Sequence, residues 1–176
     1  MKSEKALFLD RDGIINVDHG YTSTIEGFEF TKGIFDLLHY FQKKRYRLFV
    51  VTNQSGIGRG YYTESDYRKL TEWMLTQLHE QSIAIDEVFH CPHRPDEACH
   101  CRKPKTGMIE QALRTYPIDL KHSWLIGDKQ SDIQLADNAG IGHSIYIGSG
   151  TPPVATLSFG SVEACAHYFQ ENPGKI

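Results

Sequence analysis

The sequence predicts an α/β protein with a doubly wound, Rossmann-like parallel sheet in a single domain. Short apolar runs of strand length alternate along the chain with amphipathic stretches of helix length, a pattern typical of a parallel sheet covered by helices on both faces. The chain has 176 residues, the length of one domain, and no internal repeat or linker divides it. Residues 1–176 are therefore expected to form one domain.

Five strands and five helices are expected. The helical pattern is clearest where apolar residues recur three and four positions apart, as from Ile34 to Phe41 and again after a cap at Thr63. The strands are expected at residues 5–9, 46–51, 86–90, 123–126 and 144–147. The helices are expected at residues 33–44, 63–81, 109–116, 131–139 and 162–170.

Composition excludes several classes of function. The formal net charge of -3, with no run of like charges, gives no basic surface for nucleic acid. No apolar stretch approaches the roughly 18 residues of a membrane span, and residues 1–5 lead straight into a strand rather than into a signal-peptide core. We therefore expect a cytoplasmic protein without a nucleic-acid or membrane partner. No exposed apolar helix face is apparent, so a monomer is expected.

Polar clusters follow four of the expected strands. Asp10 follows the first strand, Thr52 begins a cluster after the second, a Cys/His group follows the third, and Asp128 follows the fourth. In an open parallel sheet, ligands bind at the carboxyl ends of strands, near the point where the strand order reverses. The sequence therefore places all four clusters on one edge of the sheet.

Asp10 and Asp12 carry the first chemical signal. They are two residues apart, so on an extended backbone both side chains point to the same side, and Gly13 permits a tight turn after them. One carboxylate could attack a phosphate ester while the other moves protons. Two carboxylates repel an anionic phosphate unless a cation intervenes, which predicts Mg²⁺ with Asp128 as a further ligand. Alone, such a pair is more often a solvated turn.

Thr52 and Lys103 add the groups that a phosphate needs. The hydroxyl of Thr52 and the amides that follow it open a glycine-containing loop, which could hold phosphoryl oxygens. Lys103 supplies a cation that could neutralise charge developing on the transferred group. Taken singly, the segment that begins at Thr52 could be just a turn, and a lone lysine is usually a solvated surface residue.

Three cysteines and a histidine form a second cluster in the loop at residues 91–101. Cys91, His93, Cys99 and Cys101 supply three thiolates and an imidazole, the ligands that tetrahedral Zn²⁺ prefers. Four protein ligands leave no open position, so a structural zinc site is expected rather than a catalytic one. The fourth cysteine, Cys165, lies in a helical pattern far away and is expected to be a buried core thiol.

Four elements occur in this order, each after an expected strand: the pair Asp10 and Asp12, then Thr52, Lys103 and Asp128. They resemble the four motifs of the haloacid dehalogenase (HAD) superfamily of aspartate-nucleophile phosphatases. The resemblance implies that Asp10 is the nucleophile and a Mg²⁺ ligand. It implies that Asp12 is the general acid/base and offers its backbone carbonyl to the metal. It also implies that Thr52 and Lys103 steady the phosphoryl group, and that Asp128 completes the metal site.

The spacing of the motifs leaves little chain for a lid. About forty residues separate Asp10 from Thr52, and only one helix, one strand and the zinc loop separate Thr52 from Lys103. We therefore expect no cap domain, and an open site bounded by the loop at residues 14–28 and by the zinc loop. Asp132, one helical turn after Asp128, is expected to support the site.

Longer stretches carry a closer resemblance, at residues 10–13, 16–21, 28–30, 52–57, 59–60, 91–93, 101–104, 107–108 and 127–129. Over roughly residues 5–148 they resemble the D-glycero-D-manno-heptose 1,7-bisphosphate 7-phosphatase family. Members of that family remove the 7-phosphate of a sugar bisphosphate. The product, heptose 1-phosphate, is a precursor of the nucleotide-activated heptose of lipopolysaccharide or other surface glycans.

The same resemblance implies a substrate pocket. Arg102 would recognise the distal part of the sugar phosphate, and its guanidinium suits a second phosphate because it can bind one bidentately. Lys129 would offer its carbonyl to Mg²⁺ and its side chain to the substrate. The remaining implied pocket residues are Asp18, His19, Gly20, Tyr21, Thr52, Asn53, Gln54 and Ser55.

Two departures and two alternatives accompany this interpretation. Ile14 stands where the family's first motif usually has threonine, which removes a hydroxyl near the nucleophile.

The short zinc loop also occurs in histidinol-phosphatases, so histidinol phosphate is an alternative substrate, although residues 19–21 and 107–108 favour the heptose enzyme. A phosphoaspartate receiver domain for signalling is an alternative of another class. Asp12 argues against the receiver, because a residue that activates water shortens the life of a phosphoaspartate.

Overall fold

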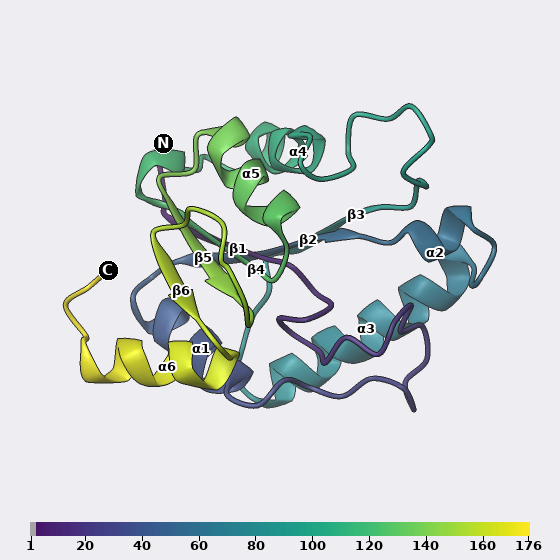
Figure 1. The fold of residues 1–176 in the computed structure, drawn as a ribbon. Helices are drawn as coiled ribbons and strands as arrows, with labels where there is room; N and C mark the ends of the chain where they lie inside the picture. Colours follow the sequence, from purple (N-terminus) through teal and green to yellow (C-terminus); the bar gives the residue numbers. More distant parts are fainter. Residues whose placement is uncertain (1–2) are drawn as a thin grey trace.

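Six parallel strands form one sheet in residues 3–176, the part of the chain that the computed structural model describes (Figure 1). They lie side by side in the order β3-β2-β1-β4-β5-β6. From β1 the chain moves outward to β2 and β3, and then returns to form the other half of the sheet from β4. The residues that follow β1 therefore lie where the strand order reverses. The strands are β1 (Ala6–Leu9), β2 (Arg47–Asn53), β3 (Glu87–Cys91), β4 (Trp124–Gly127), β5 (His143–Ile147) and β6 (Leu157–Phe159).

Helices cover both faces of the sheet. In Figure 1, α4 and α5 lie on one face, whereas α1, α3 and α6 lie on the other. This arrangement confirms the predicted doubly wound α/β fold. No helix in the described part of the chain combines the length and hydropathy needed to cross a membrane. The helices are α1 (Ile34–Lys43), α2 (Ser55–Gly58), α3 (Glu64–Glu80), α4 (Gly107–Thr115), α5 (Gln130–Ala139) and α6 (Val162–Glu171), with a 3₁₀ turn at Leu120–His122.

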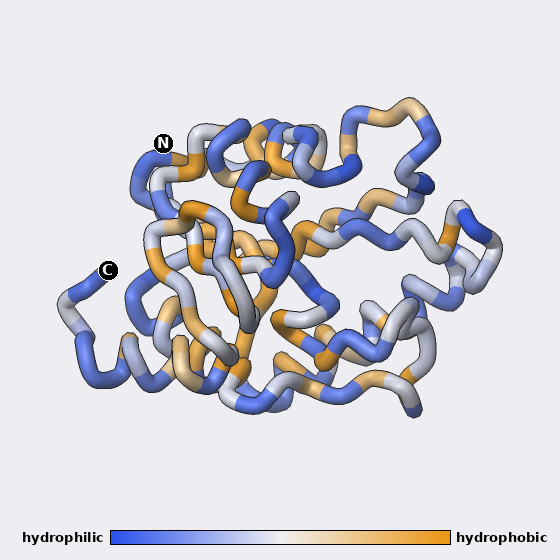
Figure 2. Tube along the Cα trace, viewed as in Figure 1, coloured by the Kyte–Doolittle hydropathy of each residue, from blue (hydrophilic) through white to orange (hydrophobic). Residues whose placement is uncertain are grey.

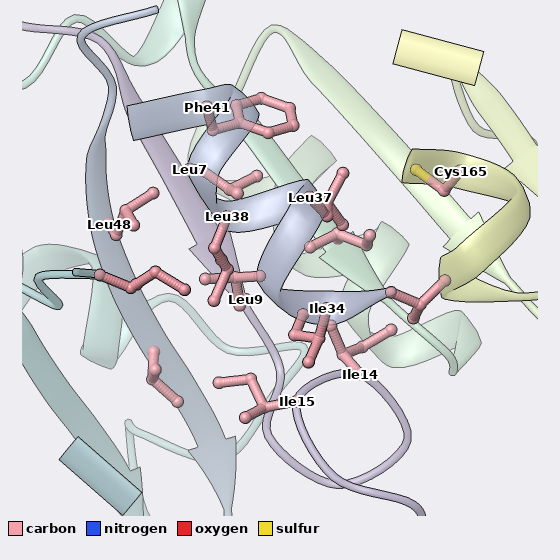
Figure 3. Packing of buried hydrophobic residues seen from close by; sticks show 14 of the residues in the cluster. Leu7, Leu9, Ile14, Ile15, Ile34, Leu37, Leu38, Phe41, Leu48 and Cys165 are labelled. Atoms are coloured by element: carbon pink, nitrogen blue, oxygen red, sulfur yellow. The ribbon is translucent and has the colours of Figure 1, made fainter. Parts of the chain in front are cut away.

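The core has two halves because side chains alternate across each strand. In β1, Leu7 and Leu9 pack with α1, α3 and α6, whereas Ala6 and Phe8 pack with α4 and α5. Figure 3 shows Leu7 and Leu9 lying against Leu38 of α1. Figure 2 shows the same distribution over the whole molecule, with hydrophobic residues along the central strands and hydrophilic residues along the connecting loops. A strand buried on both faces gives a rigid base for the residues that follow it.

The start of α3 is fixed by a capping box. Thr63 Oγ1 accepts a hydrogen bond from the Asp66 amide at 3.1 Å, and Asp66 Oδ2 accepts one from the Thr63 amide at 2.9 Å. The cap expected at Thr63 is confirmed. Each such cap contributes about 1 kcal/mol to helix stability. It also fixes where the short turn between α2 and α3 ends.

The expectation of five strands is wrong, since β6 forms a sixth strand at the edge of the sheet. Leu157 and Phe159 are partly buried, Ser158 between them is exposed, and Gly160 follows, so the alternation is too short to indicate a strand. The four-residue helix α2 and the 3₁₀ turn were also not expected, because such short elements carry no helical period. The expected elements are all present, with ends displaced by one or two residues.

Candidate active site

A cleft of about 410 Å³ opens at the carboxyl ends of β1, β2 and β4. It lies where the strand order reverses, as the sequence predicted. Fourteen residues from four separate stretches of the chain line it. They are Asp10, Asp12, Asp18, Gly20, Tyr21, Asn53, Gln54, Ser55, Arg59, Tyr62, Arg102, Lys103, Lys129 and Ser131.

Lys103 lies at the bottom of the cleft between two carboxylates. Its Nζ is 3.0 Å from Asp10 Oδ1 and 2.6 Å from Asp132 Oδ1, and it donates a hydrogen bond to the Val51 carbonyl at 3.0 Å. Burial alone would lower the pKa of Lys103, but the charges of Asp10 and Asp132 outweigh it and hold this pKa above its usual value. Lys103 is therefore a fixed cation beside Asp10.

The carboxylates around Asp10 suit a divalent cation. Burial raises the pKa of Asp10 to about 8, although the charge of Lys103 opposes this shift. Further positive charge nearby would stabilise the anionic form of Asp10. Asp128 Oδ1 is buried and has no hydrogen-bond partner, whereas the oxygens of Asp132 already accept from Lys103 Nζ and from the Lys129 amide. Asp128 therefore offers a free oxygen, close to a carboxylate oxygen of Asp10, and both are of the hard type that Mg²⁺ prefers.

Gly13 allows the backbone after Asp12 to approach this carboxylate pair. Its φ of 90° lies in the left-handed region, and a Cβ at this position would lie 2.1 Å from Asp128 Oδ2. No side chain fits in that space. The glycine therefore brings the backbone next to Asp128, and the residues present fit a cation held by both carboxylates and by main-chain oxygens.

Asp12 is held from two sides by hydrogen-bond donors. Its Oδ1 accepts from Arg11 Nη2 at 2.8 Å and from Asn16 Nδ2 at 3.0 Å. Its Oδ2 accepts from Gln54 Nε2 at 3.0 Å. Arg11 is almost completely buried and also donates to the carbonyl of Thr22 at 2.7 Å. The orientation of Asp12 is therefore set by partners from two segments of the chain, its own loop and the one that carries Gln54.

Asn53 ties the end of β2 to the segment that carries Lys103. Its Oδ1 accepts a hydrogen bond from the Lys103 amide at 3.0 Å. Thr52 is fully buried, and its hydroxyl accepts from Gln54 Nε2 at 2.8 Å. Thr52 is therefore not among the residues that line the cleft, whereas Asn53, Gln54 and Ser55 are.

The loop at residues 14–28 forms one wall of the cleft. Asp18 Oδ1 accepts from the Gly20 amide at 2.9 Å, and its Oδ2 lies 3.9 Å from Lys129 Nζ. Tyr21 lines the cleft, and its ring meets that of Tyr61 edge to face at 4.8 Å between ring centres. His19 does not line the cleft. Its Nε2 lies 3.0 Å from Glu29 in an exposed position.

Arg102 and Lys129 also line the cleft, and three further lining residues had no predicted role. Arg102 Nη1 donates to the His93 carbonyl at 3.4 Å, which ties the guanidinium to the Cys/His loop. Arg59, Tyr62 and Ser131 were missed. Arg59 stood in one of the stretches that carried the family resemblance, but that gave it no role. For Tyr62 and Ser131 no sequence signal was available.

The Cys/His cluster assembles as a compact set of donors. Atoms of Cys91, His93, Cys99 and Cys101 all lie within 4.8 Å of one another, with Cys101 Sγ 2.7 Å from Cys91 Sγ and 3.2 Å from His93 Nδ1. Burial raises the pKa of Cys91, so its thiolate needs a cation nearby. These four residues could hold a metal ion. Cys165 lies apart, fully buried in the core beside α1, as expected for a core thiol.

Comparisons with known proteins agree with this geometry. Residues 100–168 match the HAD-hydrolase-like family model. A D-glycero-alpha-D-manno-heptose-1,7-bisphosphate 7-phosphatase of Campylobacter jejuni is 53% identical over 143 residues, covering 81% of this chain and 82% of the relative. A D-glycero-beta-D-manno-heptose-1,7-bisphosphate 7-phosphatase of Helicobacter pylori is 47% identical over 148 residues, covering 84% and 86%. The structure of D,D-heptose 1,7-bisphosphate phosphatase from B. bronchiseptica, complexed with magnesium and phosphate, aligns with a TM-score of 0.84 at 27% identity, covering 96% of this chain and 99% of the other.

The protein is a phosphatase of the HAD class, as the fold, the buried pair of Asp10 and Lys103 and these comparisons together define. Within that class, the high identity to curated relatives over most of both chains is decisive. The chain belongs to the D-glycero-D-manno-heptose-1,7-bisphosphate 7-phosphatase family. The resemblance seen in the sequence is confirmed.

Proposed function

We propose that this protein removes the 7-phosphate of D-glycero-D-manno-heptose 1,7-bisphosphate and leaves heptose 1-phosphate. This reaction would serve the biosynthesis of nucleotide-activated heptose for lipopolysaccharide or other surface glycans. The observation that carries the proposal is a single cleft that combines Asp10 and Lys103 at its bottom with Arg102 on its wall. The first pair suits the phosphate that is removed, and Arg102 suits the phosphate that stays. The names of the curated relatives support this substrate.

Asp10 and Asp12 divide the chemistry in this proposal. A carboxylate oxygen of Asp10 forms a bond to phosphorus as the bond from phosphorus to the sugar oxygen breaks, and the carboxyl of Asp12 gives its proton to that leaving oxygen. Asp12 then takes a proton from water, and the water oxygen displaces Asp10 from phosphorus, releasing phosphate. Lys103 neutralises charge on the phosphoryl oxygens, and Thr52 keeps the adjacent loop in place.

The Mg²⁺ proposed here would be held by the carboxylates of Asp10 and Asp128 and by the backbone carbonyls of Asp12 and Lys129. The unpartnered oxygen of Asp128 and the close approach of Gly13 support this set. When bound, the ion supplies the positive charge that lets an anionic phosphate approach two carboxylates. The relative from B. bronchiseptica was solved with magnesium and phosphate, which supports the choice of metal.

The substrate is proposed to lie between the two walls of the cleft. Arg102 would bind the distal phosphate, and the side chain of Lys129 would contact the substrate near Asp18. The backbone and side chains of the 18–21 and 52–55 segments would contact the sugar. Of these, His19 and Thr52 point elsewhere, so their contribution would come through the loops to which they belong. The residues that the sequence assigned to this pocket are Asp18, His19, Gly20, Tyr21, Thr52, Asn53, Gln54, Ser55, Arg102 and Lys129.

The proposed substrate is tested by phosphate release from both anomers of heptose 1,7-bisphosphate, histidinol phosphate and a hexose 6-phosphate. We expect kcat/KM to be at least about 100-fold higher for one bisphosphate anomer than for either monophosphate. Arg102→Ala should remove most of this preference and leave the rates on monophosphates nearly unchanged, because only the bisphosphate offers a second anion. Arg94→Ala, an exposed arginine on the same loop, is the matched control. A kcat/KM higher for histidinol phosphate would contradict the proposal.

We also propose that Cys91, His93, Cys99 and Cys101 hold a structural Zn²⁺. Three thiolates and one imidazole in a closed set suit zinc better than Mg²⁺, and no open position is left for chemistry. The loop continues directly into Arg102 and Lys103, so the ion would fix where these two cations point. The exposed His100, which lies 3.0 Å from Glu110, takes no part in the set.

Removal of zinc is therefore expected to lower activity through the loop. Chelation followed by Mg²⁺ alone should leave less than about a tenth of the initial rate, and added Zn²⁺ should restore it, with metal content measured alongside. Cys101→Ser should behave like the zinc-free protein, whereas Cys165→Ser, outside the cluster, should retain its zinc. Full activity in a sample shown to contain no zinc would refute this role.

Three further proposals concern the chain as a whole. We infer that residues 1–176 fold as one domain, that the protein works as a monomer, and that it acts in the cytoplasm. The continuous sheet supports the first, and the absence of an acidic or basic field supports a small-molecule sugar bisphosphate, rather than nucleic acid, as its partner.

A further inference from the structure

Tyr62 forms a buried hydrogen-bond relay to Asp12. Its hydroxyl donates to Gln54 Oε1 at 2.5 Å, and Gln54 Nε2 in turn donates to Asp12 Oδ2 at 3.0 Å and to Thr52 Oγ1 at 2.8 Å. Gln54 is only 2% exposed and Tyr62 only 7%. The side chain that family resemblance assigned to the substrate is thus already engaged with protein atoms on both sides of its amide.

Tyr62 determines which way the Gln54 amide points. A carboxamide can be turned by half a rotation, which would exchange its oxygen and nitrogen. In the turned state the amide oxygen would face the carboxylate of Asp12, and the amide nitrogen would face the phenol. Burial raises the pKa of Tyr62 to about 12, so the phenol keeps its proton and needs an acceptor at Oε1. The phenol therefore stabilises the orientation that presents an N–H to Asp12.

The ring of Tyr62 packs into space left by the missing side chain of Gly56. A Cβ at residue 56 would lie 2.2 Å from Cε1 of the Tyr62 ring, so only glycine lets the ring pack against α2. On the other side, the capping box at Thr63 begins α3 directly after Tyr62. The neighbouring Tyr61 is 60% exposed and has no such contacts with the relay. Tyr62 is therefore held between two fixed helix ends.

The relay also distinguishes the two oxygens of Asp12. A carboxylate oxygen has about two acceptor positions. Both positions of Oδ1 are occupied by the donors Arg11 and Asn16, whereas Oδ2 accepts from Gln54 alone. Oδ2 is consequently the oxygen with a position left for the proton that moves to the leaving group.

We propose that Tyr62 is a positioning residue that acts through Gln54 to aim Oδ2 of Asp12 at the leaving oxygen of the substrate. This inference rests on the proposed function of Asp12 as the proton donor. Its step is the transfer of one proton from Asp12 Oδ2 to the sugar oxygen as the bond from that oxygen to phosphorus breaks. Tyr62 and Gln54 exchange no proton in the step.

The test compares two substrates that differ in their need for a proton. A sugar alkoxide is a poor leaving group and needs protonation, whereas p-nitrophenolate leaves without it. Tyr62→Phe should lower kcat/KM about 10-fold on the sugar bisphosphate and less than about 2-fold on p-nitrophenyl phosphate. The ratio kcat/KM is used because it reports the steps up to formation of the phosphoaspartate. Tyr40→Phe, on α1 and away from the cleft, removes a phenol hydrogen bond to the Pro173 carbonyl and should leave kcat/KM unchanged on both substrates.

A second variant tests the connection through the amide. Gln54→Met should show the same selective loss, and adding Tyr62→Phe to it should cause no further change on either substrate, because the relay is already cut. Equal losses on both substrates with Tyr62→Phe, wild-type rates on both, or fully multiplicative losses in the double variant would each overturn the relay.

Asp10→Asn, assayed in parallel, separates the relay from the function on which it rests. Retained activity in that variant would show that the covalent route itself is wrong. An inactive Asp10→Asn together with an unaffected Tyr62→Phe would overturn only the relay.

Discussion

Replacing Asp10 with asparagine is expected to lower phosphate release by at least about 1,000-fold, because a carboxamide oxygen does not attack phosphorus and cannot form the phosphoaspartate. The measurement is phosphate release from the bisphosphate at saturating Mg²⁺. Asp137→Asn, an exposed aspartate on α5, makes the same chemical change outside the cleft and should leave the rate within about 2-fold of wild type. A variant that keeps more than about a tenth of the wild-type rate would exclude Asp10 as the nucleophile.

The same variant should fold normally. Burial raises the pKa of Asp10 to about 8, far above its value in the unfolded chain, so at neutral pH this group ionises more readily in the unfolded chain, which lowers the free energy of unfolding. This decrease is absent below the unfolded pKa and grows as pH rises toward about 8. Without added Mg²⁺, Asp10→Asn should therefore have a Tm at pH 7 equal to or above that of wild type. A large drop in Tm would show that the activity is lost through misfolding instead.

Replacing Lys103 with methionine should remove both activity and stability. Asp10 and Asp132 would remain as two buried carboxylates without their cation, and breaking a buried ion pair in this way costs about 3–5 kcal/mol in the free energy of unfolding. Activity should fall at least about 100-fold because charge on the phosphoryl group is no longer neutralised. Denaturant unfolding and steady-state rates are the two measurements. Lys69→Met, an exposed lysine on α3, is the control.

A double variant separates these two effects. Adding Asp132→Asn to Lys103→Met removes one of the two uncompensated carboxylates, so it should restore a large part of the stability. It should restore none of the activity, because the cation beside Asp10 is still missing. Recovery of the rate in the double variant would show that Lys103 acts mainly as a structural partner of Asp132.

Much of the site could be predicted from the sequence because its residues follow buried strands. Asp10, Asn53 and Asp128 come at or just after the ends of β1, β2 and β4, and short apolar runs mark those strands clearly. Lys103 was also located correctly, although it follows no strand directly, because the Cys/His loop before it has its own recognisable spacing. The position of these residues at neighbouring strand ends thus followed from the parallel sheet, whereas their chemical roles came from the family resemblance.

What could not be predicted depends on contacts between distant segments. Gln54 stands in a motif that suggested substrate contact, yet its amide is used by Asp12, Thr52 and Tyr62, and only the packing of α2 shows this. Tyr62 lies in a turn whose sequence has no period, so nothing distinguished it from the exposed Tyr61. In the same way, β6 is recognisable as a strand only by its pairing with β5.

The open cleft has a consequence for how the reaction cycle runs. Between β1 and β2 the described chain contains only the loop at residues 10–33 and α1, so the substrate reaches Asp10 without a moving domain. A phosphoaspartate formed there would be exposed to bulk solvent as soon as the sugar leaves, and the second water-dependent half of the cycle would need no reopening. The enzyme would then depend on positive charges that line the cleft, such as Arg59 and Arg102, to bind a bisphosphate in preference to the many monophosphate esters of the cell.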